Sequence, residues 1–207
     1  MIEGVEPLWD ALEATPPDLP IALGIGLVEG VYRVPFLDRV CEVAQGTRTV
    51  TLARRDGGSD RDGSEAHDSA GPLALAVLSY LCHIDSVGLD DEWVSEKALP
   101  GGSIFFQGPH ALPLAPLVEH FGENASAFAA SGQAVGGVPS EYGDASVMLE
   151  TFPKVPVCFV LWEGDDEFPA NATAMFDRSI ARIFALDVIL AVVESAVRLI
   201  VNEAPGT

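Results

Sequence analysis

Lysine is nearly absent from this 207-residue chain. Only Lys97 and Lys154 are present, and 11 basic residues in all stand against 31 acidic ones, which gives a formal net charge of −20. A surface of this charge repels the phosphates of nucleic acids and the headgroups of anionic membranes. We therefore expect neither a nucleic acid nor a membrane surface as a partner.

Cysteine is also scarce. Cys41, Cys82 and Cys158 are odd in number, far apart and without a C-x-x-C pair. This distribution does not fit a disulfide framework, a zinc knuckle or an iron–sulfur site. The first residues show no basic segment followed by an apolar one, so no secretory signal is expected. We expect a cytoplasmic protein with reduced, buried cysteines.

No uninterrupted apolar run is long enough for a membrane span. The most apolar stretch, ALDVILAVVESAVRLIV, is interrupted by Asp187, Glu194 and Arg198. A transmembrane helix needs about 20 predominantly apolar residues. We expect this stretch to form a buried helix instead.

Recognisable catalytic and nucleotide-binding motifs are missing as well. The sequence has no G-x-S-x-G elbow and no G-x-G-x-x-G or G-x-x-x-x-G-K-[ST] phosphate loop. Its four histidines are not spaced as H-x-x-x-H or H-E-x-x-H, the patterns of helical zinc sites. These absences favour a non-catalytic protein and leave an enzyme of unrecognised type open.

Acidic residues, in contrast, are abundant from Glu3 to Glu203. Two interpretations compete: an acidic functional patch, or a whole surface adapted to a salty cytoplasm. The spread of acid and the shortage of lysine favour the second, and with it an extreme halophile of haloarchaeal type as the source. A run of carboxylates then needs a second reason before it indicates a site.

Apolar periodicity predicts the elements. Strands are expected at 31–37, 40–44 and 49–53, in two extended segments around Pro153 and Pro156 within 146–162, and in a short piece at 104–107. Helices are expected near residues 8–12, at 72–84, on the approach to His120, at 174–184 and at 187–202, with Asp187 as N-cap. The pattern predicts an α+β fold, with a small antiparallel or mixed sheet, packed helices and a C-terminal helical pair; α/β is the runner-up.

The predicted organisation is one domain with two irregular regions. Residues 1–29 form an N-terminal extension, and residues 30–204 form the domain. Within it, residues 54–71 are polar, rich in Gly, Ser and Asp and free of apolar periodicity. We expect a mobile acidic loop there.

The stretch LWEGDDEFPANATAMFDRS, residues 161–179, is the strongest candidate site. A strand that ends at Trp162 would bring the carboxylates of residues 163–167 to one sheet edge. Three alternatives remain open: Asp165 and Glu167 hold a divalent cation, the carboxylates accept backbone N–H groups in a structural turn, or they are merely solvated. Asp177 is expected to cap a following helix.

Two glycine-containing turns complete the set of candidates. Gly101 and Gly102 would allow a backbone to approach a ligand closely, with turn geometry as the alternative. Asp144 follows a similar glycine turn. The candidate ligand-binding residues are Trp162, Asp165, Glu167, Asp177, Asp144, Gly101 and Gly102.

The C-terminal block FPKVPVCFVLWEGDDEFPANATAMFDRSIARIF resembles the signature of the domain-of-unknown-function family 3786. The shared features are a P-x-x-P corner, an apolar strand ending in Trp, a G-D-x-E-F-P-A turn and a Phe-Asp pair. The upstream segments LSYLCHID, WVSEKALPGG and GGVPSEYGDAS are similar to the family's other blocks. The resemblance extends over about residues 30–200.

The family has no established reaction, so the resemblance implies a context. Relatives occur in anaerobic bacteria and archaea, and some are joined to an iron–sulfur domain like that of the corrinoid iron–sulfur protein. This chain has no four-cysteine segment, which argues against direct electron transfer.

We therefore expect a ligand-binding or accessory protein of corrinoid or redox cofactor metabolism. The expected cofactor is a tetrapyrrole such as a corrinoid, or a divalent cation. The expected partner is a protein of an anaerobic redox or one-carbon pathway. The alternatives are an enzyme with a divalent-cation site at 163–167 and a structural protein–protein interaction module.

Overall fold

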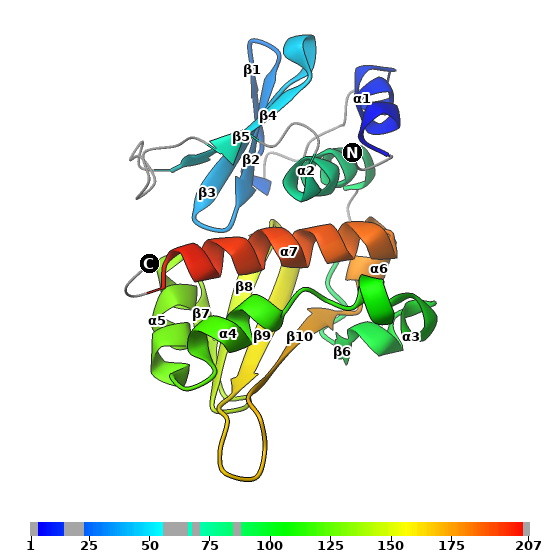
Figure 1. The fold of residues 1–207 in the computed structure, drawn as a ribbon. Coiled ribbons are helices and arrows are strands. Elements are labelled where there is room, and N and C mark those ends of the chain that lie inside the picture. Colours follow the sequence, from blue (N-terminus) through cyan, green and yellow to red (C-terminus); the bar gives the residue numbers. More distant parts are fainter. Residues whose placement is uncertain (1–3, 15–22, 56–65, 68–70, 85–87, 205–207) are drawn as a thin grey trace.

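A computed structural model of the chain describes residues 4–14, 23–55, 66–67, 71–84 and 88–204 (Figure 1). They form an α+β fold, as predicted, with two antiparallel five-stranded sheets. Helices pack between and against the sheets. The strand orders are β1-β2-β3-β4-β5 in the first sheet and β6-β10-β9-β8-β7 in the second.

The first sheet is a meander in chain order. Its strands are β1 (Gly26–Val28), β2 (Val31–Phe36), β3 (Arg39–Ala44), β4 (Thr49–Arg54) and β5 (Ala66–His67). The three predicted strands are confirmed. The predicted boundary at residue 30 falls in the turn between β1 and β2. Of the predicted acidic loop, β5 pairs with β4, and residues 56–65 and 68–70 lie outside the described residues.

The second sheet is built around a long hairpin. Its strands are β6 (Trp93–Ser95), β7 (Val138–Ser140), β8 (Ala145–Phe152), β9 (Val155–Trp162) and β10 (Asn171–Asp177). The hairpin of β8 and β9 turns at Pro153, where the sequence predicted a corner. The residues of β9 are almost all buried, because this strand lies in the middle of the sheet.

Helices connect and cover the sheets. The α-helices are α1 (Val5–Ala14), α2 (Pro72–His83), α3 (Gly102–Phe105), α4 (Ala115–Phe121), α5 (Ala125–Ala134), α6 (Ile180–Ile183) and α7 (Leu186–Asn202), and the 3-10 turns are η2 (Gln45–Thr47), η3 (Glu96–Ala98) and η4 (Gly108–His110). Figure 1 shows α7 between the two sheets, with α2 beside it. One cluster of buried apolar side chains includes residues of both sheets and both helices, so α2 and α7 join the halves into one core.

The region after the β9–β10 loop corrects a prediction. The sequence predicted a helix at 174–184, but residues 171–177 form β10 and only Ile180–Ile183 are helical. Ala172, Ala174 and Phe176 alternate into the core at the period of a strand, and this packing overrides the helix preference of alanine and methionine.

Three local predictions also change. Residues 104–107, predicted as extended, include the end of α3. Asp177 is the last residue of β10 and caps no helix directly. Asp187 lies in the first turn of α7, whose N-cap is Ala185, so it complements the helix dipole and is not the N-cap.

None of the described helices is both long enough and apolar enough to cross a bilayer.

Candidate functional site

The predicted acidic turn is the loop between β9 and β10. Asp165 Oδ1 accepts hydrogen bonds from the backbone N–H groups of Glu167 at 2.8 Å and Phe168 at 2.7 Å. The Asp165 N–H donates to the Phe168 carbonyl at 2.9 Å. The two N–H donors stabilise the carboxylate and lower the pKa of Asp165. This carboxylate therefore shapes the turn, as the second of the three alternatives requires.

Replacing Asp165 by alanine should loosen this turn without disturbing the core. The amide hydrogens of Glu167 and Phe168 lose their acceptor and should exchange faster with solvent, as amide exchange by NMR can measure. The pKa of Asp165 is lowered in the folded protein. Protection of these amide hydrogens in the wild type is therefore complete above the ordinary pKa of Asp and is lost as the pH falls through the lowered pKa. Asp166→Ala is the control, and equal acceleration in both variants would contradict the assignment.

Two further carboxylates fix the loop to its surroundings. Glu163 accepts a hydrogen bond from the N–H of Ala125 at the start of α5, at 2.5 Å, where the helix dipole favours a negative charge. Asp144 accepts one from the N–H of Glu163 at 2.8 Å. The N–H of Gly164 donates to the Gly122 carbonyl at 3.0 Å. The loop is thus tied to the α4–α5 turn and to the start of β8.

Trp162 closes β9 beside the same turns and is 38% exposed. A Cβ atom placed on Gly143 would lie 3.3 Å from the indole and 2.7 Å from Val160. Gly143 also has φ +60°, a left-handed conformation that suits glycine. The indole and the turn before β8 therefore pack closely, which brings Trp162 and Asp144 together as neighbours.

Asp177 lies at the opposite end of β10 from the acidic turn. Its side chain is only 3% exposed, and Oδ1 accepts hydrogen bonds from the N–H groups of Asp90 at 3.0 Å and Ser179 at 2.9 Å. Burial raises the pKa of Asp177, but hydrogen bonds from the Ser179 hydroxyl and from the N–H groups of Asp90, Ser179 and Asp91 outweigh it and leave the pKa lowered. Asp177 therefore holds the segment before β6 against the end of β10.

Gly101 and Gly102 are explained by the conformation and packing of the chain's own backbone. Gly101 has φ +77° and precedes α3. A Cβ atom on Gly102 would lie 1.9 Å from the carbonyl oxygen of Glu96. The close approach that the sequence suggested is therefore made by η3, and it explains Gly102 without a ligand.

The predicted residues separate into distinct places. The first place, at one end of the second sheet, holds Trp162, Asp144, Asp165 and Glu167; Asp177 lies at the far end of β10, and Gly101 and Gly102 lie before α3. Within the described part of the chain, no group of three or more His, Cys, Asp or Glu side chains is placed to hold a metal ion. Cation binding by Asp165 and Glu167 stays a prediction.

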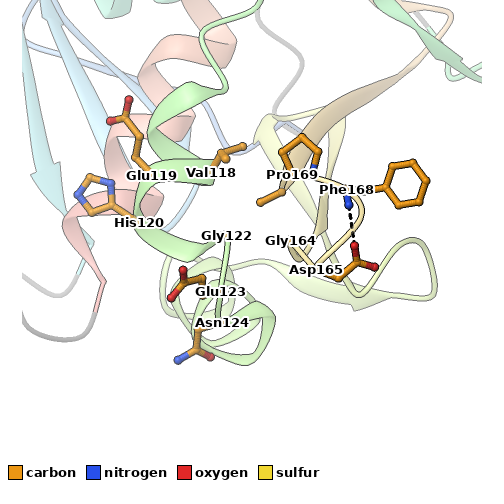
Figure 2. Close-up of a pocket in the computed structure, with 11 residues that line it drawn as sticks. Val118, Glu119, His120, Gly122, Glu123, Asn124, Gly164, Asp165, Phe168 and Pro169 are labelled. Atoms are coloured by element: carbon orange, nitrogen blue, oxygen red, sulfur yellow. Dashed lines mark hydrogen bonds between the residues drawn. The ribbon is translucent and has the colours of Figure 1, made fainter.

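An open cavity of about 640 Å³ lies between the acidic turn and α4. Figure 2 shows Val118 directed toward Pro169, whereas Glu119 and His120 point to the other side of α4. Phe168 points away from α4 and is 68% exposed. The charged side chains around this cavity splay apart and do not converge on one point.

A second cavity of about 360 Å³ lies along the same helix, between η3, the segment before α4 and the start of β10. Its lining is mainly apolar, from Phe106, Ala111, Leu112, Leu114, Ala115, Val118 and Ala172. Its polar lining comes from Glu96, Lys97, Asn171 and Thr173. Val118 borders both cavities, and we refer to the two together as the α4 groove.

Nothing in the sequence indicated this groove. Residues 112–116, LPLAP, belong to the predicted approach to His120, and Lys97 stands out in the sequence only because lysine is rare. The apolar character of this segment and the positive charge of Lys97 are evident from the sequence. Nothing in the order of residues indicates that both lie next to the start of β10.

A buried charge cluster was missed as well. Arg39 is 2% exposed and lies 3.6 Å from Asp38 and 3.4 Å from Glu203, nitrogen to oxygen. Arg54 lies 3.3 Å from the same Glu203 oxygen. Burial raises the pKa of Asp38 more than Arg39 and Arg54 lower it. The cluster connects the first sheet to the C-terminal end of α7, beside a cavity of about 380 Å³.

A family profile described as "Domain of unknown function (DUF3786)" matches residues 16–199. The chain belongs to this family. In the DUF3786 fold seen here, the P-x-x-P corner is the β8–β9 turn and the G-D-x-E-F-P-A motif is the β9–β10 loop. No curated protein and no solved structure matches the chain.

Proposed function

We propose that the chain is a non-catalytic, ligand-binding accessory protein and that the α4 groove binds its ligand. The observation that supports this most directly is the meeting of an apolar and a polar cavity at Val118. Small-molecule sites are typically concave, largely apolar, and about 300–1,000 Å³ in volume, with a few polar groups that orient the ligand. The second cavity of the α4 groove, of about 360 Å³ and mainly apolar lining, has these properties, and the first cavity extends it with more polar surroundings.

The proposed context follows from the family resemblance. A tetrapyrrole of corrinoid or redox cofactor metabolism is the first ligand to test, and the proposed partner is a protein of an anaerobic redox or one-carbon pathway. The composition supports the salt-rich cytoplasm of a haloarchaeon as the setting. Ligand measurements should therefore be made in molar KCl and repeated in dilute buffer, where loss of the folded state would support this setting.

Val118→Trp tests the proposed function. The larger indole would project from the shared wall and occupy space in both cavities. Binding of hydroxocobalamin or haem should therefore weaken by about tenfold or more. Absorbance titration measures this, and native mass spectrometry of protein from its own cells shows whether any small molecule is retained.

Val138→Trp is the matched control, because Val138 is 57% exposed on β7, outside the groove. It should bind as the wild type does. The proposal fails if native protein carries no small molecule and binds neither tetrapyrrole, or if both tryptophan variants bind normally.

A further inference from the structure

We propose that the α4 groove selects an amphipathic organic anion, with Lys97 binding its negatively charged end. This inference rests on the proposed function and specifies the chemical class of the ligand.

The charge of Lys97 is unusual in its surroundings. Most described arginines are neutralised by carboxylates, as the ion pairs of Arg33, Arg39, Arg48, Arg54, Arg178 and Arg182 show. Within the residues that the structure describes, the Lys97 ammonium forms neither an ion pair nor a hydrogen bond. In a chain of net charge −20, such a group is a local point of attraction for an anion.

The wall beside Lys97 determines the rest of the ligand. Phe106 is 4% exposed and forms part of this wall with Leu112, Leu114 and Val118. These side chains stabilise an apolar body but offer it no hydrogen bonds. A ligand with an apolar body and an anionic end therefore matches the cavity better than a uniformly polar one.

Glu96 restricts where the negative charge of that ligand can lie. It lines the same cavity as Lys97, on the adjacent residue of η3. A negative charge placed beside the Glu96 carboxylate would be repelled. The anionic end of the ligand is therefore expected on the Lys97 side of the cavity.

The effect of the ligand's charge on binding is measured with two probes that share one apolar body, 2-naphthylacetate and its neutral amide, 2-naphthylacetamide. Binding to the full chain is measured by calorimetry at the lowest KCl concentration at which the protein stays folded, because salt screens exposed charges. The wild type should bind the acid about two- to fivefold more tightly than the amide, as expected for an exposed ion pair.

Lys97→Gln should abolish this preference and leave binding of the amide unchanged. Lys154→Gln is the matched control, because it removes the other lysine, in the β8–β9 turn, and should keep the preference. An unchanged preference in Lys97→Gln overturns the inference, as does a wild type that binds neither probe.

Val118→Trp separates this inference from the proposed function. If it abolishes binding of both probes while Lys97→Gln changes nothing, the groove is a binding site and only the role of Lys97 is wrong. If Val118→Trp leaves both probes bound as before, the probes bind elsewhere, and the inference and the groove assignment both fail.

Discussion

Arg39→Met is expected to lower the free energy of unfolding by about 3–5 kcal/mol, the usual cost of removing one partner from a buried ion pair. The Arg39 side chain is 2% exposed, while those of Asp38 and Glu203 are 19% and 11% exposed. Without the guanidinium, two largely buried carboxylates lose a neighbouring positive charge and their desolvation is no longer offset. Urea or guanidinium denaturation measures the loss.

Arg33→Met is the matched control for this prediction. Arg33 and Glu42 form an ion pair of 3.3 Å, but their side chains are 56% and 39% exposed. Exposed pairs contribute about 0–1 kcal/mol, so this variant should be almost as stable as the wild type. Equal losses in the two variants would mean that burial does not decide the effect.

The loss of stability in Arg39→Met should depend on pH because Asp38 titrates beside Arg39. Because the pKa of Asp38 is raised in the folded state, its contribution to stability is complete below the ordinary value and is lost as the pH rises through the raised value. Removing Arg39 takes away a positive charge that lowers this pKa. The destabilisation of Arg39→Met should therefore increase from acidic to neutral pH.

The sequence predicted the fold best where one periodicity dominates. Residues 31–54 alternate clearly, and β2, β3 and β4 were predicted to within one residue at each end, whereas β1 and β5 were not predicted. The apolar face of α7 was equally clear. The helix prediction was wrong at residues 174–177 because alanine and methionine favour helices, whereas β10 forms by pairing with β9 and β6.

The candidate site was predicted only in part, for a related reason. The end of a strand at Trp162 and the turn that contains Asp165 were predicted correctly, because both are local features. The α4 groove combines Lys97, Val118 and Ala172, which come from three separate segments. Such a convergence depends on tertiary packing and leaves no local pattern in the sequence.

Asp177→Ala is expected to destabilise the protein by about 3 kcal/mol, because hydrogen bonds to a charged acceptor are strong and buried donors left without one are costly. The side chain is 3% exposed and accepts hydrogen bonds from the N–H groups of Asp90 and Ser179. These donors belong to two segments that Asp177 joins. Their amide hydrogens should therefore exchange faster in the variant.

The pH dependence of the free energy of unfolding distinguishes loss of the Asp177 carboxylate charge from simple loss of packing. The pKa of Asp177 is lowered, so its contribution is complete above the ordinary value and is lost as the pH falls through the lowered value. The stabilities of the wild type and Asp177→Ala should converge in acid. Asp177→Asn keeps one acceptor oxygen and should lose less than Asp177→Ala. If the wild type and Asp177→Ala differed in stability by the same amount at every pH, the carboxylate charge would not hold the two segments together.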